Sequence, residues 1–214
     1  MSTRTPSIWR AAALVVALPL LLGACASASD QPTEQAPEAS SAPSPDLAED
    51  REWTGTIVID GENVEITLDG EEAPQAVASF VTLAEDGFFD GVSCHRLTTA
   101  GIFVLQCGDP TGSGSGGPGY SFGPVENDPS DGVYPAGTIA MARIGNDGDS
   151  NGSQFFLVYE DSTIPSDSAG GYSVFGAITG GLDVVQGIAA DGVEGGASDG
   201  TPASPAVIES VVVE

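Results

Sequence analysis

The sequence predicts a mainly β domain in which short strands close into a barrel and helices cover its ends. Three observations lead to this fold class. Short β-rich runs recur along the chain, Gly- and Pro-rich stretches separate them, and only two segments space their apolar residues as a helix does. About 160 residues follow Trp53 without another linker, a length that suits one domain with a single core.

The first predicted elements are a hairpin and a helix. Residues 54–59 and 63–68 are β-rich runs, and the Asp-Gly-Glu turn between them favours a hairpin. A helix is expected to begin near Pro74, because proline is favoured in the first turn, where its missing N–H costs nothing. Gly87 is expected to end the helix. The apolar face of this helix is predicted to consist of Val77, Phe80, Val81 and Ala84.

Short strands account for most of the remaining chain. They are predicted at residues 93–98, 102–107, 137–142, 154–159 and 173–176, and a β-branched run closes the chain at 207–213. A short second helix is predicted over residues 181–188, because Leu182, Val185 and Ile188 recur near helical spacing. Many short strands with only one or two helices predict a closed β-barrel whose ends the helices cover.

The N-terminal segment, residues 1–24, is predicted to be a signal peptide. Arg4 and Arg10 precede a short apolar run, which falls below the roughly 20 residues that would cross a bilayer. The sequence Leu-Gly-Ala-Cys that ends at Cys25 resembles the lipobox of bacterial lipoproteins. This resemblance implies that Cys25 is lipidated and anchors the protein at the extracytoplasmic face of the cell membrane. The alternative is an ordinary cleaved signal with an incidental cysteine.

Residues 25–52 are predicted to be a disordered, acidic tether that begins at the lipidated cysteine. They consist mainly of Ala, Ser, Pro and acidic residues, with too little apolar surface to offset the entropy of ordering. The folded domain is therefore assigned to residues 53–214.

The charge of the chain argues against several classes of partner. Five Lys and Arg residues face 31 Asp and Glu, for a formal net charge of −26, and no residue is lysine. Such a surface repels nucleic acid and anionic lipid headgroups, so partners are expected to be neutral or cationic. The charge is interpreted mainly as an aid to solubility.

Residues for metal or nucleophilic chemistry are scarce. His95 is the single histidine, and no group of potential ligands has the spacing of a zinc site, so no metal is expected. Asp147 to Gly152 matches the start of an EF-hand calcium loop, but Val158 occupies the twelfth position, where glutamate is required. Calcium binding and Ser-His or Cys-His catalysis are therefore not expected.

Five remaining motifs occur in a characteristic order. They are Cys94-His95-Arg96-Leu97, Phe103 to Asp109, Met141-Ala142-Arg143, Asn151 to Phe156 and Val174-Phe175-Gly176. In this order they resemble the FHR, GFMxQGGD, MAN, GSQFF and VFG pattern of the cyclophilin family, over essentially all of residues 53–214. The resemblance implies an eight-stranded antiparallel β-barrel capped by two helices. It also implies peptidyl-prolyl cis/trans isomerase activity without a cofactor.

The resemblance makes Arg96 the catalytic residue. An X-Pro amide resists rotation with a barrier near ~20 kcal/mol because of resonance. Twisting the bond localises the nitrogen lone pair, so a fixed guanidinium donor aimed at that nitrogen binds the twisted amide better than either planar isomer. The mechanism needs no covalent intermediate, metal or cofactor.

The resemblance also assigns the substrate-binding residues. Gln106 and the main chain of Ala142 and Arg143 would hold the substrate backbone, and Gln154 would support Arg96 by hydrogen bonding. The slot for the proline ring would be formed by Phe103, Val104, Phe156, Ile164 and Tyr172.

The chain departs from the family pattern at several of these positions. Val104 replaces a methionine, Arg143 an asparagine and Cys107 a glycine, and two extra residues lie between His95 and Gln106. In an oxidising compartment, Cys94 and Cys107 either form a disulfide across a hairpin or remain buried free thiols.

The predicted function is peptidyl-prolyl isomerisation that assists the folding of exported proteins. Proline-containing polypeptides are the expected partners, and the protein is expected to be a monomer. The alternative is a non-catalytic module, a chaperone or surface receptor that captures proline-containing segments in the same groove. The altered Val104 and Arg143 keep this alternative open.

Overall fold

The structure, a computed structural model, describes residues 41–214. The predicted signal peptide and Cys25 lie outside these residues. The described elements, in chain order, are the 3-10 turn η1 (Pro45–Ala48), β1 (Glu52–Ile59), β2 (Glu62–Asp69), α1 (Pro74–Glu85), β3 (Val92–Ser93), β4 (Arg96–Thr98), β5 (Val104–Cys107), β6 (Val133–Tyr134), β7 (Thr138–Met141), β8 (Phe155–Val158), β9 (Ser162–Thr163), β10 (Val174–Gly180), α2 (Leu182–Asp191), the 3-10 turn η2 (Glu194–Gly196), β11 (Asp199–Gly200) and β12 (Val207–Val213).

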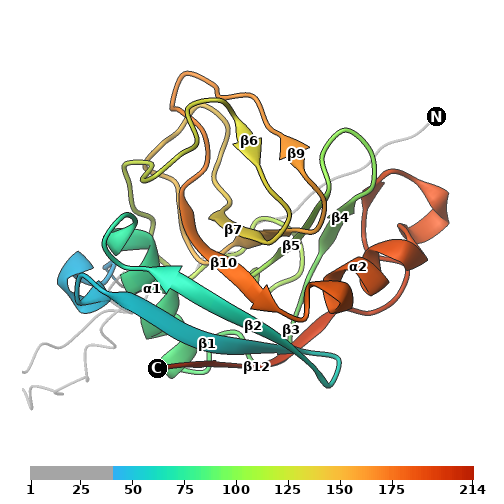
Figure 1. Ribbon diagram of the computed structural model, residues 1–214, viewed down its shortest axis with the longest axis horizontal. Helices are drawn as coiled ribbons and strands as arrows, with labels where there is room; N and C mark the ends of the chain where they lie inside the picture. Colours follow the sequence, from blue (N-terminus) through green and yellow to red (C-terminus); the bar gives the residue numbers. More distant parts are fainter. Residues whose placement is uncertain (1–40) are drawn as a thin grey trace, which may run out of the picture. The chain divides into compact units, whose positions relative to one another are not determined.

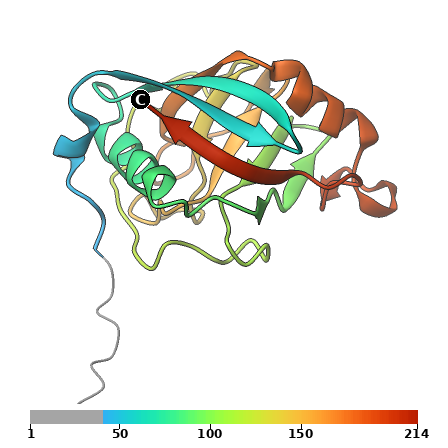
Figure 2. The ribbon, with the colours of Figure 1, turned by 90° about the horizontal axis from the view of Figure 1, so that it is seen from below.

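One curled antiparallel sheet dominates the fold, with α1 and α2 at its opposite ends (Figures 1 and 2). Its ten strands follow the order β11-β4-β5-β8-β7-β10-β2-β1-β12-β3, and β6 and β9 form a separate pair. The prediction of a closed eight-stranded barrel is therefore wrong in two respects. The sheet contains ten strands, and its edge strands β11 and β3 do not pair with each other to close it.

The extra strands have a local cause. The run predicted as one strand over residues 93–98 divides at Cys94–His95, and its two halves pair with different partners. The first half, β3, pairs with β12, whereas the second half, β4, pairs with β5 and β11. The two-residue strand β11 lies in a Gly-rich loop that shows no strand pattern, so the sequence does not predict it.

Both predicted helices are present. The predicted apolar face of α1 is buried, and the ring of Phe80 contacts those of Phe89, Phe155 and Phe175. The N-terminus of α1 has no side-chain cap of its own, and the carboxylate of Glu126 instead accepts the N–H groups of Gln75 and Ala76, each at 3.0 Å. Within residues 41–214, neither helix is long and apolar enough to cross a bilayer.

Part of the predicted tether is folded. Residues 45–48 form η1, and Ala48 is fully buried beside the backbone of Gly70. The indole N–H of Trp53 donates to the Ala48 carbonyl at 2.9 Å, and the Gln75 side chain donates to the Pro43 carbonyl at 2.9 Å. The predicted disorder over residues 25–52 is therefore wrong for the described residues 41–52, because these specific contacts compensate for the small apolar surface of the segment.

Candidate active site

A single row of paired residues across five strands builds the centre of the site. Arg96 pairs with Gln106, Gln106 with Phe156, Phe156 with Ala140, and Ala140 with Val174. Directly paired residues of neighbouring strands project from the same face of a sheet. The sheet therefore brings together side chains from positions 96, 106 and 156.

The alternation of strand residues divides the apolar side chains into two clusters. Leu97, Leu105 and Leu157 point to the main core, which α1 covers. Val104 and Val158 point to the opposite face and form a second cluster with Phe156. Since successive strand residues face opposite sides, the same short strands supply both the core and the site.

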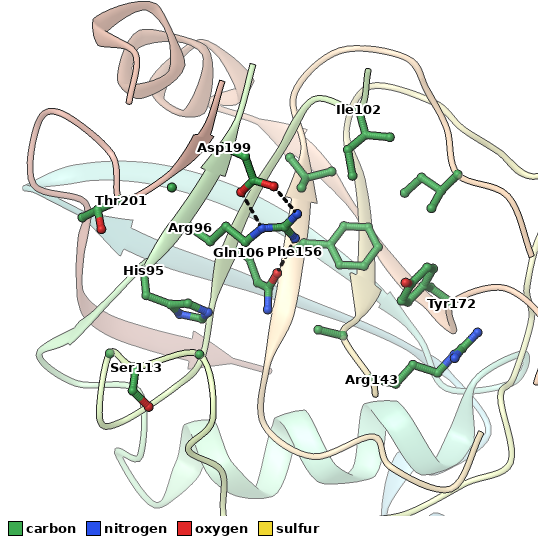
Figure 3. A pocket seen from close by; sticks show the side chains of 16 residues that line it. His95, Arg96, Ile102, Gln106, Ser113, Arg143, Phe156, Tyr172, Asp199 and Thr201 are labelled. Carbon is green, nitrogen blue, oxygen red and sulfur yellow. Dashed lines mark hydrogen bonds and ion pairs between the residues drawn. The ribbon is translucent and has the colours of Figure 1, made fainter. Parts of the chain in front are cut away.

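The Arg96 guanidinium is held from two sides (Figure 3). Its Nε and Nη2 atoms donate to the two carboxylate oxygens of Asp199 at 2.8 and 2.9 Å, and its Nη1 atom donates to Oε1 of Gln106 at 3.1 Å. The hydrogen bond to Asp199 raises the pKa of Arg96, so the guanidinium stays charged. The same bond lowers the pKa of Asp199, so the carboxylate stays ionised.

Arg96 keeps donors for a substrate. A guanidinium has five N–H groups, and these contacts account for three of them. Figure 3 shows the guanidinium ending beside the ring of Phe156. The site thus places a fixed cation with free donors next to an apolar surface.

A series of hydrogen-bonded side-chain amides supports Arg96. Gln106 donates through Nε2 to Oε1 of Gln154 at 2.9 Å, and Gln154 donates through its own Nε2 to the Gly116 carbonyl at 2.9 Å. Each amide orients the next, which fixes the Gln106 oxygen that accepts from Arg96. Gln154 therefore acts on Arg96 through Gln106 and not by the direct contact that the prediction implies.

The apolar part of the site is a cavity of about 490 Å³. Phe156 and Tyr172 form one wall, their rings edge to face with centroids 5.5 Å apart. The buried Tyr134 lies behind them, and its hydroxyl accepts the N–H of Tyr172 at 2.8 Å. The apolar and aromatic residues that line the cavity are Ile102, Val104, Ala142, Phe156, Ile164 and Tyr172. A slot with these walls accommodates a small apolar ring.

Phe103 does not line this cavity, so its prediction as a pocket residue is wrong. Its ring packs edge to face against Tyr159 at 5.9 Å, on the side of the main core. Ile102 takes a place in the cavity instead. Since successive residues of an extended chain face opposite sides, Ile102 and Val104 point to the cavity and Phe103 between them points away from it.

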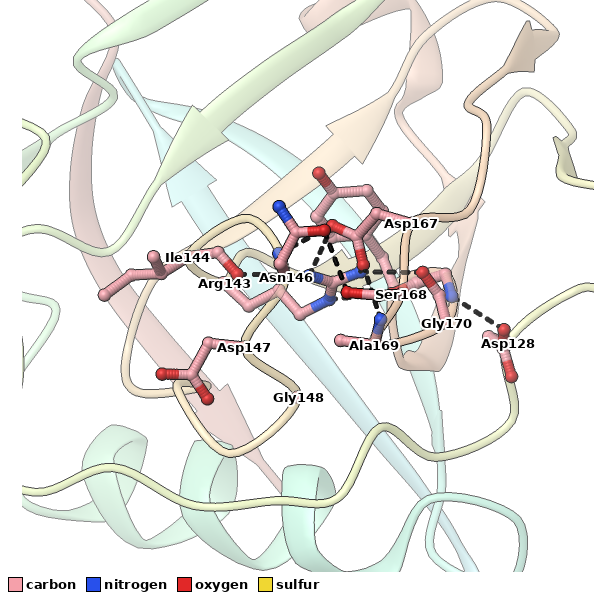
Figure 4. Close-up of polar contacts among 12 residues, drawn as sticks. Asp128, Arg143, Ile144, Asn146, Asp147, Gly148, Asp167, Ser168, Ala169 and Gly170 are labelled. Atoms are coloured by element: carbon pink, nitrogen blue, oxygen red, sulfur yellow. Dashed lines mark hydrogen bonds and ion pairs between the residues drawn. The ribbon is translucent and has the colours of Figure 1, made fainter.

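The sequence assigns a role only to the main chain of Arg143, and the structure shows that its side chain has a separate role, in holding a neighbouring loop. The side chain is 1 % exposed, and its guanidinium points to the loop at residues 166–171 (Figure 4). It makes a fork with both carboxylate oxygens of Asp167, at 3.0 and 2.9 Å, and its guanidinium lies 4.8 Å from the ring centre of Tyr172. Its main chain remains available, because within residues 41–214 the Arg143 N–H and C=O make no hydrogen bond.

A second cavity of about 400 Å³ adjoins the first and shares Gln106, Ala142 and Arg143 with it. Gln154 lines this second cavity, together with the loop at residues 114–118. The buried carboxylate of Asp109 holds that loop by accepting the N–H groups of Thr111 and Gly116, at 2.7 and 3.1 Å. The Gly-rich stretch is thus a fixed wall of the site.

A disulfide joins Cys94 and Cys107, one of the two arrangements that the sequence allows. It flanks the Arg96–Gln106 pair and ties the start of β4 to the end of β5.

His95 lies next to Cys94 in the chain, and burial lowers the pKa of its imidazole. Its two ring nitrogens have no hydrogen-bond partner within residues 41–214. In the same described residues, no three His, Cys, Asp or Glu side chains are grouped to hold a metal.

Comparison with known proteins identifies the family. The family model described as "Cyclophilin type peptidyl-prolyl cis-trans isomerase/CLD" matches residues 55–213. The chain belongs to the cyclophilin family. Among solved structures, a cyclophilin type peptidyl-prolyl cis-trans isomerase of Cryptosporidium parvum aligns with a TM-score of 0.64 at 24% identity, covering 77% of this chain and 98% of that one. This similarity agrees with the cyclophilin fold.

The curated relatives include bacterial proteins named as peptidyl-prolyl cis-trans isomerases. A probable peptidyl-prolyl cis-trans isomerase B of Mycobacterium tuberculosis is 46% identical over 74% of this chain and 54% of its own length. Peptidyl-prolyl cis-trans isomerase B of Bacillus subtilis is 41% identical over 61% of this chain and 86% of its own length. This cyclophilin thus spans about half the length of the mycobacterial relative.

Three residues of the site escape prediction from the sequence. Asp199 lies 103 positions from Arg96, in a loop where no motif marks it. Tyr134 lies in a two-residue strand, and Ile102 in the stretch that departs from the family pattern. The sequence suggests only that the Arg96 guanidinium needs a hydrogen-bond acceptor. With 31 Asp and Glu residues in the chain, it does not tell which of them is the acceptor.

Proposed function

We propose that this cyclophilin catalyses cis/trans isomerisation of X-Pro bonds in polypeptides. The observation that carries the proposal is the Arg96 guanidinium, held by Asp199 and Gln106, with free N–H groups beside the Phe156 wall of the apolar cavity. A Cryptosporidium parvum relative has been crystallised in the presence of the dipeptide Ala-Pro, which supports a proline-containing substrate.

The mechanism follows from this geometry. The proline ring enters the slot between Val104, Phe156 and Tyr172, and the free main chain of Arg143 pairs with the substrate backbone. Rotation about the X-Pro bond breaks amide resonance and leaves a lone pair on the prolyl nitrogen. An Arg96 N–H donates to that lone pair only in the twisted state, which lowers the barrier for both directions. Every step uses side-chain and main-chain groups of this chain, and no proton is transferred.

A coupled isomerisation assay on a proline-containing peptide tests the proposal. Arg96→Ala is expected to lower kcat/KM about 100-fold, the usual effect of losing one hydrogen-bond donor to the transition state. Arg51→Ala is the matched control, because Arg51 also pairs with a carboxylate, Glu49, but lies outside the cavity. Equal rates for the native protein and Arg96→Ala would reject this mechanism. Peptide binding without any acceleration by the native protein would instead favour the non-catalytic module.

The cellular role belongs to the same proposal. The predicted signal peptide, the lipobox-like sequence and the acidic segment that follows it support a lipid anchor at the extracytoplasmic face of the membrane, where the protein assists the folding of exported proteins. Replacement of Cys25 by serine is expected to move the protein from the membrane fraction to the soluble fraction. Retention of Cys25→Ser in the membrane would reject the lipid anchor.

A further inference from the structure

We propose that Asp199 is a positioning residue for Arg96 in this reaction, an inference that rests on the proposed isomerase function. Asp199 lines the cavity and accepts hydrogen bonds from two of the three guanidinium nitrogens of Arg96. It does not act as an acid or a base, because the mechanism transfers no proton. It acts by fixing the direction of the donors that remain on Arg96.

The backbone pairing around Asp199 places its side chain beside Arg96. Asp199 and Gly200 form β11, which pairs with Thr98 and Leu97 of β4, the strand that carries Arg96. The N–H of Thr99 also donates to the Ser198 carbonyl at 2.9 Å. The carboxylate and the arginine thus project from neighbouring strands of one sheet, and this two-residue pairing holds the loop that carries Asp199 against β4.

Arg96 needs this second support. Its side chain is 39 % exposed, and without Asp199 its guanidinium would keep one contact, the 3.1 Å bond from Nη1 to Gln106. A single bond at one end allows a long side chain to swing, whereas a carboxylate fork fixes the plane of the guanidinium. The reaction depends on that plane, because a donor misplaced by about 1 Å loses much of its effect on the barrier.

The fork leaves the reactive side of Arg96 open. It uses Nε and one N–H of Nη2, so a second N–H of Nη2 and one of Nη1 remain for the substrate. The carboxylate also balances the charge of Arg96. Catalysis then relies on the direction of a hydrogen bond and not on an uncompensated positive charge, which suits substrates without nearby acidic groups.

Kinetics of Asp199 variants test this role. Asp199→Ala is expected to lower kcat/KM about 10-fold, which corresponds to about 1.4 kcal/mol of transition-state stabilisation. Asp199→Asn retains an acceptor for one nitrogen and should lose about threefold, a partial rescue. Glu194→Gln is the control, since it removes a charge from an exposed residue of the same loop. Affinity for the peptide should stay unchanged in all three, so that the loss appears in the isomerisation rate of bound peptide.

A double-variant cycle shows whether Asp199 acts through Arg96. In an Arg96→Ala background, Asp199→Ala should cause no further loss. An equal loss in both backgrounds, or an unchanged or higher rate in Asp199→Ala alone, would overturn the proposal.

An NMR measurement separates this inference from the proposed function. The Nε–H signal of Arg96 should be sharp and slow to exchange with water in the native protein, and should broaden in Asp199→Ala but not in Glu194→Gln. This result is expected even if the native protein proves to be inactive as an isomerase. An Nε–H signal that Asp199→Ala leaves unchanged would show that the carboxylate does not hold Arg96 in solution.

Discussion

Replacement of Arg143 by alanine should destabilise the loop that supports the proline slot. The Arg143 guanidinium uses all five N–H groups: two for Asp167, and one each for the carbonyls of Ile144, Gly170 and Gly171. It also packs against Tyr172, one wall of the slot. Its removal leaves the loop at residues 166–171 with fewer contacts to the rest of the site, chiefly the hydrogen bonds to Asn146 and Asp128.

The expected magnitude follows from these contacts. The carbonyls of Gly170 and Gly171 each lose a charged donor, at about 1 kcal/mol apiece, the lower end of the usual range because water can enter the loop. The contact with Tyr172 adds about 0.5–1 kcal/mol. We therefore expect the free energy of unfolding to fall by about 3 kcal/mol.

Urea unfolding followed by circular dichroism measures this loss. Arg143→Lys should show a smaller loss, because lysine keeps the charge but cannot form the fork. Arg143→Asn, which introduces the residue of the family pattern, should lose about as much as alanine, because the asparagine side chain is too short to reach Asp167. Peptide affinity should fall in the alanine and asparagine variants as Tyr172 loosens. If the free energy of unfolding of Arg143→Ala falls by less than about 1 kcal/mol, the Arg143 side chain does not hold the loop at residues 166–171 as inferred.

Two further predictions concern the walls of the site. Burial alone would raise the pKa of Asp109, but the hydrogen bonds that its carboxylate accepts lower this pKa well below its usual value. The carboxylate therefore contributes its full stability above the pKa of an unfolded aspartate, and this stability is lost as the pH falls through the lowered pKa of the folded protein. Asp109→Asn should be less stable at neutral pH and should show a weaker decline on acidification, and parallel acid unfolding curves would contradict this. The Cys94–Cys107 disulfide closes a loop with a separation of 13 residues, so its reduction should lower the free energy of unfolding by about 3 kcal/mol. Equal urea midpoints for the oxidised and reduced protein would contradict that value.

The sequence predicts best where local chemistry decides the structure. The periodic apolar residues of α1 and the hairpin of β1 and β2 depend on neighbours close in the chain, and both occur as expected. Positions such as Arg96, Gln106 and Phe156 are identified by motif, and the structure brings them into one row.

The sequence predicts least where contacts are long-range or where the chain departs from the family pattern. Asp199 reaches Arg96 through an irregular loop, so no periodicity marks it. Phe103 stands between Ile102 and Val104 where the chain departs from the family pattern, and there the motif does not tell which of these apolar residues face the cavity. Residues 41–52 have the composition of a tether, but the Trp53 indole and Gln75 provide individual polar contacts that composition does not reveal.

The pairing of β4 with β5 links folding fidelity to function. A slip of one residue between these strands would turn Leu105 and Cys107 outward and force the Gln106 amide into the apolar core. It would also carry Cys107 to the face opposite Cys94, so that the disulfide could not close. Such an error could not leave a stable but inactive molecule, because the core, the covalent bond and the active groove all depend on one register. A molecule misfolded in this way would therefore be exposed to proteolysis and would not persist as an inactive protein that still binds substrate.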